Sequence, residues 1–218
     1  MTPCHKDSRE MAYIDIHTHN TAKKEVTAVY NGTIPLPTDR KISVGLHPWD
    51  IDSEWREKFE AIAVAAKAGN VAMIGECGID YVKAGTPAEL QEEIFKEHIK
   101  LSESVHKPLI IHCVKAFDRI IALHKEHKPT QAWIIHGFRG KPQLAASLTR
   151  EGLYLSLGEH FNSESARTIP CNRLFVESDE SAKSIEEIYT AIAQERGCTT
   201  EELAEQTKEN ARHCGIEF

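Results

Sequence analysis

Eight short runs of apolar and β-branched residues recur along the chain, and from the third run onward they alternate with stretches of helical period. This alternation is typical of βαβ units and therefore of a parallel sheet. A chain of 218 residues is long enough for a (β/α)8 barrel, which needs roughly 200 residues. We predict an α/β TIM-type barrel with strands at residues 12–16, 25–30, 41–46, 71–76, 108–112, 132–136, 153–157 and 173–177.

Amphipathic helices are expected at residues 53–67 (with Ser53 as the N-cap), 87–105, 116–125, 142–149, 184–195 and 200–213. The first three strands, by contrast, are separated only by short segments that are polar or contain proline. Pro35 and Pro37 oppose a helix there, because proline lacks the backbone N–H and clashes with the preceding turn. We expect a distorted barrel that lacks the outer helices after strands 1 and 2.

The chain shows no internal repeat and no linker. Residues 1–10 are polar and charged, and we interpret them as a flexible tail. Residues 11–218 are then predicted to form a single barrel domain, in which 31–40 is a loop.

The cysteine pattern and the length of the apolar segments indicate the cellular compartment of the protein. Six cysteines form no CxxC pair, and the first ten residues contain no apolar segment of the kind found in signal peptides. No run approaches the roughly 18 apolar residues that span a bilayer. We predict a reduced, cytoplasmic protein that does not associate with membranes.

Acidic residues and histidines stand at the ends of most predicted strands. They are Asp15, His17, His19, His47, Glu76, His112, His136, Glu177 and Asp179. The carboxyl ends of the strands of a parallel barrel meet at one rim, which is where barrel enzymes carry their active sites. His17 and His19 are two positions apart, so they point to the same side of an extended strand.

Each of these groups alone has an ordinary explanation, such as a core histidine or a helix-capping carboxylate. That explanation would have to hold independently at every strand end, so a shared metal site explains the set better. Imidazole and carboxylate donors suit Zn²⁺, Mn²⁺, Fe²⁺ or Co²⁺, and Mg²⁺ where carboxylates dominate. Cys77 and Cys113 follow candidate donors by one position, so we expect them to face away and pack. Histidines on or near helices are expected to be solvated or to cap: His98, His106, His124, His127 and His213.

The net charge constrains the partners. It is −7, with a sequence pI near 5.9 and no basic run. This charge opposes tight binding along a nucleic-acid duplex through its phosphates. It does not oppose hydrolysis of a phosphate ester, because bound cations supply local positive charge.

Seven segments resemble, in order, the motifs of the TatD family of metal-dependent hydrolases, within the amidohydrolase-like superfamily. They are IDIHTH (14–19), VGLHP (44–48), IGECGIDY (74–81), PLIIHCVKA (108–116), IIHGFRG (134–140), FVESDE (175–180) and TKENARHCG (207–215). The resemblance covers most of the chain, as a short variant of a TatD-type deoxyribonuclease. It implies a distorted TIM barrel, two divalent metal ions and hydrolysis of phosphodiesters, often in DNA.

The resemblance also assigns roles to residues. It implies two sets of metal ligands that share Glu76: His17, His19 and Asp179 for one ion, and His112 and His136 for the other. Three residues are expected to act in catalysis. Asp179 would accept a proton from the attacking water, Glu76 would hold the ions at a fixed separation, and His47 would donate to a phosphate oxygen.

The chain departs from the family pattern at two of the motifs. Val114 stands where the family commonly has arginine, and Glu180-Ser181 stands where Ala-Pro is frequent. Contacts to the substrate are therefore expected to differ, with His47, Lys115 and Arg139 as candidates. The expected substrate is a phosphodiester at DNA ends or in an oligonucleotide, bound by a monomer or a small homo-oligomer.

Two other functions stay open. The same site can hydrolyse a carboxylic ester or amide, such as the aminoacyl ester of tRNA, and the missing arginine slightly favours this. The chain can also be a non-catalytic metal-binding interaction protein, although the complete donor set opposes that reading. The absence of two outer helices would leave part of the barrel wall for a dimer to cover.

Overall fold

The eight strands form one parallel sheet in chain order. The computed structural model describes residues 13–22, 27–83 and 85–218. The strands are β1 (Ile14–Thr18), β2 (Thr27–Asn31), β3 (Lys41–Val44), β4 (Val71–Asp80), β5 (Leu109–Val114), β6 (Trp133–Ile135), β7 (Tyr154–Leu157) and β8 (Leu174–Val176). The predicted segment 1–10 lies outside the described residues, and its separation from a domain at 11–218 stays a prediction.

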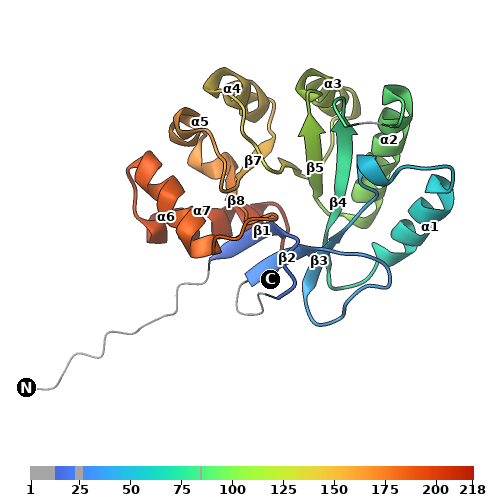
Figure 1. The fold of residues 1–218 in the computed structure, drawn as a ribbon, viewed down its shortest axis with the longest axis horizontal. Coiled ribbons are helices and arrows are strands. Elements are labelled where there is room, and N and C mark those ends of the chain that lie inside the picture. The colour runs from blue at the N-terminus through green and yellow to red at the C-terminus, as the bar shows by residue number, and fades with distance from the viewer. Residues whose placement is uncertain (1–12, 23–26, 84) are drawn as a thin grey trace, which may run out of the picture.

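The last strand returns to the first, and β1 and β8 lie side by side (Figure 1). A parallel bridge joins Thr18 to Asp179. The backbone N–H of Asp179 donates to the carbonyl of His17 at 3.0 Å, and the N–H of His19 donates to the carbonyl of Asp179 at 3.1 Å. The sheet is thus a nearly closed barrel, and the predicted fold is confirmed.

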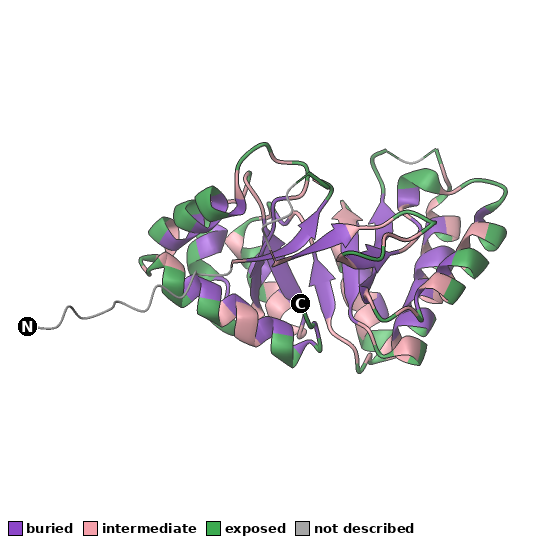
Figure 2. Cartoon of the chain, turned by 90° about the horizontal axis from the view of Figure 1, so that it is seen from below, coloured by how far each residue is buried: buried purple, intermediate pink, exposed green. Residues whose placement is uncertain are grey.

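Helices cover the sheet from outside. They are η1 (Pro48–Asp50), α1 (Trp55–Ala65), α2 (Ala88–Val105), α3 (Phe117–His127), α4 (Pro142–Arg150), α5 (Ser163–Thr168), η2 (Cys171–Arg173), α6 (Ile185–Arg196) and α7 (Thr200–His213). Their buried faces turn toward the strands and their exposed faces toward solvent (Figure 2). Among the described residues, no helix follows β1 or β2, as predicted. None of the helices in the described ranges is both long and apolar enough to cross a bilayer.

Two helix predictions were wrong. Helix α5 was not predicted, because six residues are too few to show an apolar period. The helix begins at Asn162, whose side chain accepts a hydrogen bond from the backbone N–H of Ser165 at 2.9 Å. Ser53 is not the N-cap of α1: Glu54 occupies that position and makes no side-chain cap.

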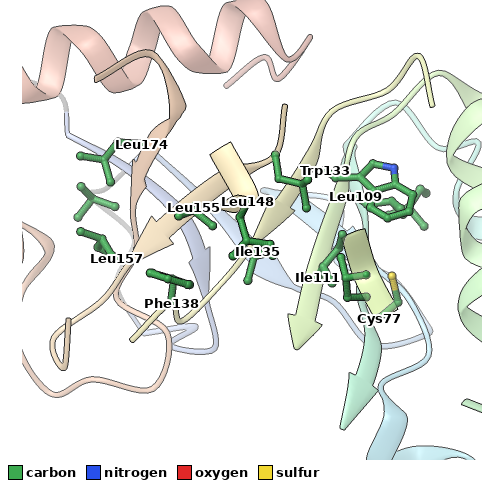
Figure 3. Packing of buried hydrophobic residues seen from close by; sticks show 14 of the residues in the cluster. Cys77, Leu109, Ile111, Trp133, Ile135, Phe138, Leu148, Leu155, Leu157 and Leu174 are labelled. Atoms are coloured by element: carbon green, nitrogen blue, oxygen red, sulfur yellow. The ribbon is translucent and has the colours of Figure 1, made fainter. Parts of the chain in front are cut away.

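Buried side chains form two layers that follow the alternation along each strand. The inner layer fills the barrel and includes Ile110 of β5. The outer layer packs the strands against the helices, and Leu109 and Ile111 belong to it (Figure 3). Cys77 and Cys113 also pack in the outer layer, as the alternation predicts. His112 therefore follows Ile110 to the inside, at the mouth of the barrel.

Gly78 lies where β4 passes close to β5. Its φ is +145°, and an added Cβ would lie 2.0 Å from the carbonyl oxygen of His112. We expect Gly78→Ala to reduce the free energy of unfolding by about 2 kcal/mol or more, because β4 would have to move away from β5. Thermal denaturation would show a Tm lowered by roughly 4 °C or more. Gly69→Ala is the control, since nothing lies within 4 Å of its added Cβ; equal Tm values for the two variants would contradict the prediction.

Candidate metal centre

The strands bring the predicted donors together at one rim of the barrel. His17 lies in β1, Glu76 in β4 and His112 in β5. Four others follow strands directly or by a short turn: His19 after β1, His47 after β3, His136 after β6 and Asp179 after β8. All seven residues of the predicted cluster are described by the structure, and short distances connect them.

Register shifts explain why β1 and β4 can deliver their donors. In β1 the inner side chain of Ile16 and the donor His17 fall on positions of different parity, and in β4 the inner Met73 and the donor Glu76 do so as well. A strict alternation would send one of them outward. The pairing shifts between Asp15 and Thr18 in β1 and between Ile74 and Cys77 in β4. Irregularities of this kind re-aim side chains at barrel rims.

Glu76 lies at the centre of the cluster and is 4% exposed. Its Oε1 faces three imidazoles. The distances from Oε1 are 2.7 Å to Nε2 of His136, 2.8 Å to Nδ1 of His112 and 3.2 Å to Nε2 of His47.

The other oxygen of Glu76 faces a second set. Oε2 is 3.4 Å from Nε2 of His17 and 3.5 Å from Nε2 of His19. The same two nitrogens lie 4.0 and 3.7 Å from Oδ1 of Asp179. One buried carboxylate therefore separates two groups of donors, each on its own oxygen.

The charges of the cluster are strongly coupled. Burial would raise the pKa of Glu76, but His136, His112 and His17 outweigh burial and hold that pKa well below its usual range. Burial would lower the pKa of His136, but Glu76 and the fully buried Glu177 raise it well above its usual range. A divalent cation at this site would displace any proton from the imidazole nitrogens that bind it.

Two further carboxylates lie behind the imidazoles. Nε2 of His112 is 3.2 Å from Oδ2 of Asp80, and Nδ1 of His136 is 3.5 Å from Oε1 of Glu177. Burial would raise the pKa of Asp80, but hydrogen bonds from the backbone of Lys83 and from Trp49 outweigh it and lower the pKa to about 2. An ionised Asp80 can accept the Nε2–H of His112. Nδ1, which lies 2.8 Å from Oε1 of Glu76, would then be the nitrogen that a cation binds. Carboxylates in this position fix the orientation of metal-binding histidines.

The sequence reasoning missed both supporting roles. Strand β4 was predicted to end at residue 76, whereas it continues to Asp80. Asp80 and Glu76 are four positions apart on this strand and face the same side, so a longer strand would have revealed Asp80. Glu177 was noted at a strand end, but nothing in the sequence connected it to His136.

His47 differs from the other imidazoles. Its Nδ1 accepts a hydrogen bond from the backbone N–H of Trp49 at 3.1 Å. A backbone N–H can only donate, so Nδ1 carries no proton and Nε2 of the neutral ring carries it. His47 therefore presents an N–H to the cluster.

The two predicted cationic contacts lie differently. Arg139 is exposed and lines a pocket of about 350 Å³ with Asp179, Glu180 and Glu159. Lys115 is exposed after β5 and is not among the residues that line this pocket. The structure thus brings Arg139, but not Lys115, into one cavity with a residue of the cluster.

The donors fit divalent cations. Both ring nitrogens of His17 are buried and have no hydrogen-bond partner among the described residues, which is unfavourable for an imidazole unless it binds something else. Two groups of donors have ligand atoms within 4.8 Å of one another: His17, His19 and Glu76; and His17, His136 and Asp179. The atoms of His47, Glu76 and His112 are equally close, but His47 offers an N–H there rather than a lone pair. Nitrogen and oxygen donors in such sets suit Zn²⁺ or Mn²⁺.

Comparison with known proteins identifies the family. The model of the family described as TatD related DNase matches residues 38–214. The chain belongs to this family. By this membership it is a TatD-type metal-dependent hydrolase, as its sequence motifs predicted.

Curated relatives of this TatD-type chain are distant. The uncharacterized metal-dependent hydrolase YabD of Bacillus subtilis (strain 168) is 28% identical over 191 residues, which cover 78% of this chain and 75% of YabD. The 3'-5' ssDNA/RNA exonuclease TatD of Enterobacter lignolyticus (strain SCF1) is 30% identical over 146 residues, 63% of this chain and 56% of the exonuclease.

Solved structures show the same fold. YJJV, a TatD homolog from Escherichia coli K12, superposes with a TM-score of 0.78 at 17% identity, covering 93% of this chain and 97% of that one. A hydrolase TatD family protein from Entamoeba histolytica has a TM-score of 0.77 at 14% identity and covers 94% and 98%. The TatD-type barrel is thus shared at low sequence identity.

Proposed function

We propose that this TatD-type hydrolase binds two divalent cations and cleaves phosphodiester bonds in DNA ends or oligonucleotides. The observation that carries the proposal is the central position of Glu76, whose two oxygens each face a separate set of donors. Two ions on such a carboxylate are the arrangement of many phosphoester hydrolases. The printed name of the relative from Enterobacter lignolyticus, an ssDNA/RNA exonuclease, supports the substrate class.

The ligand sets follow from which oxygen of Glu76 each residue faces. His17, His19 and Asp179 would hold one ion with Oε2, and His112 and His136 would hold the other with Oε1. Asp80 favours this assignment for His112, because it accepts the Nε2–H and leaves Nδ1 to coordinate. His47 does not fit as a ligand through Nε2, since that nitrogen carries the proton.

Divalent ions at these positions would lower the pKa of a bound water toward neutrality and stabilise charge that develops on the substrate. Side chains of the protein would accept the proton of the water and donate a hydrogen bond to the substrate. The side chain of Asp179 is 27% exposed and lines the pocket, so it can accept the proton of the attacking water. His47 can donate its Nε2–H to a non-bridging oxygen of the ester.

The pocket beside Asp179 would receive the substrate. Arg139 can pair with a phosphate there, while Glu159 and Glu180 add negative charge to the same lining. Lys115 is exposed at the end of β5 and would contact a longer strand. The acidic lining favours a short or terminal substrate, and it also keeps a carboxylic ester as the second candidate substrate.

Metal removal tests the proposal. We expect elemental analysis of protein purified without chelator, or reconstituted with Mn²⁺ or Zn²⁺, to find about two ions per chain. Hydrolysis of methyl p-nitrophenyl phosphate and of labelled single-stranded oligonucleotides should stop after chelation and return with the ions. The variant His213→Ala should keep the metal content and the turnover of the unmodified protein, because this histidine lies on α7 with an exposed side chain.

Three results would contradict parts of the proposal. Turnover of carboxylic esters without turnover of phosphodiesters would favour the second candidate substrate. Bound metal without turnover of any ester would favour the interaction protein. Absence of any bound or restorable metal would exclude the proposed site.

A further inference from the structure

Trp49 is a large exposed ring beside the candidate metal centre. Of the three tryptophans in the chain, Trp55 and Trp133 are buried, whereas Trp49 is 48% exposed. Its ring centroid lies 4.7 Å from that of His47 and 5.5 Å from that of His112. An indole exposed to this extent next to a reactive site suggests a role in binding.

A hydrogen bond from the Nε1–H at the edge of the ring holds the Trp49 indole in place. Nε1 donates to Oδ2 of Asp80 at 2.8 Å. Asp80 is 2% exposed, and its Oδ1 accepts the backbone N–H groups of Val82 and Lys83 at 2.8 and 3.0 Å. The ring is therefore already ordered, and a ligand that stacks on it loses little free energy in ordering the protein.

The ammonium group of Lys83 lies against the Trp49 ring. Nζ of the exposed Lys83 lies 3.2 Å from the centroid of the Trp49 ring, above its face. No acidic partner of Lys83 is recorded among the ion pairs of the described residues. An ammonium held only by a ring can move to a phosphate, which attracts it more strongly, and thereby uncover the ring.

We propose that Trp49 and Lys83 form a nucleotide subsite next to the scissile phosphodiester, in which an unpaired base stacks on the indole and the ammonium pairs with a phosphate. This inference rests on the proposed function. Stacking requires a base that is free of its own duplex neighbours, so the subsite selects single-stranded ends over duplex interiors. It accepts any base, because every base presents a π-face to the ring.

Binding to the metal-loaded protein tests the subsite. The probes are a short single-stranded oligothymidylate with phosphorothioate linkages that resist hydrolysis, and the same backbone with abasic sites. We expect the oligothymidylate to bind about tenfold more tightly than the abasic strand and to quench the fluorescence of Trp49, the exposed tryptophan. Trp49→Leu should bind both strands equally, and Trp49→Phe, which keeps a ring, should retain most of the preference.

The salt dependence of strand binding tests the role of Lys83 separately. Lys83→Gln should weaken binding of both strands alike and reduce the slope of log K against log salt by about one. Lys100→Gln is the matched control, since the Lys100 side chain is 65% exposed on α2 and the slope should not change. Equal binding of both strands by the unmodified protein, or a base preference that survives Trp49→Leu, would overturn the subsite.

Hydrolysis of methyl p-nitrophenyl phosphate, which has no base, separates the two proposals. If this small diester is cleaved but base-containing and abasic strands bind equally, the subsite is wrong and the proposed function stands. If no phosphodiester is cleaved and neither strand binds, both are wrong.

Discussion

Replacing Glu76 by glutamine is expected to reduce the metal content from about two ions to at most one and to lower turnover roughly a thousandfold or more. The carboxylate offers one oxygen to each set of imidazoles, at 2.7 to 3.5 Å. A glutamine amide keeps one oxygen and turns an NH2 group toward the other set, and an NH2 group cannot coordinate a cation. It also removes the buried negative charge that both ions would share. Elemental analysis and single-substrate kinetics measure the two effects.

Glu97→Gln is the control for Glu76→Gln. Glu97 pairs with Lys100 on the surface of α2, with a side chain that is 37% exposed. This control should keep the metal content and the turnover of the unmodified protein. If Glu76→Gln retained two ions per chain, Glu76 would not be a shared ligand, and the division of the donors between its two oxygens would have no functional meaning.

Asp179→Asn is expected to lower kcat by about 10²- to 10⁴-fold while the fold remains intact. The amide cannot accept a proton from the attacking water. The backbone should tolerate the change, because Asp179 has φ of +51° and asparagine adopts this left-handed region more readily than most residues. The two backbone hydrogen bonds to His17 and His19 do not involve the side chain.

The measurement for Asp179→Asn combines circular dichroism, thermal denaturation and steady-state kinetics on a phosphodiester. Asp118→Asn is a suitable control, since Asp118 is an exposed residue in the first turn of α3. Turnover near that of the unmodified protein would show that another group accepts the proton. A large loss of Tm would instead point to a structural role for the carboxylate.

Strand alternation explains why so much of the cluster could be predicted. Ile110 and His112, or Ile134 and His136, are two positions apart, so a residue that ends a strand inside the barrel is recognisable from the sequence. The register shift in β1 has no such signal. The convergence of its histidines with Glu76 was predicted from the strand-end positions and from the family motifs, not from the local period.

His98 shows a failure of the same reasoning. It was predicted to be solvated or to cap a helix, but it is fully buried in α2. Its Nε2 accepts the backbone N–H of Leu46 at 2.9 Å, directly before His47, and its Nδ1 lies 2.8 Å from the carbonyl of Ile94. Burial lowers the pKa of His98 to about 4, so the ring is neutral and serves as a structural link. A long-range pairing of this kind leaves no local pattern in the sequence.

The first strand, β1, meets the last strand, β8, at a junction that we call the seam. Because the candidate metal centre draws donors from both sides of this seam, it can help to hold the first and last strands together. The bridged residues Thr18 and Asp179 are 161 positions apart. Backbone hydrogen bonds and hydrogen bonds of the Asp15, Thr18 and Ser178 side chains connect their strands. A cation bound by His17, His19 and Asp179 would span this seam as a non-covalent cross-link. By mass action, binding of free metal would then add to the stability of the closed barrel. Scarcity of metal would act on the lifetime of the protein as well as on its chemistry, because an opened seam exposes strand edges to proteolysis and aggregation.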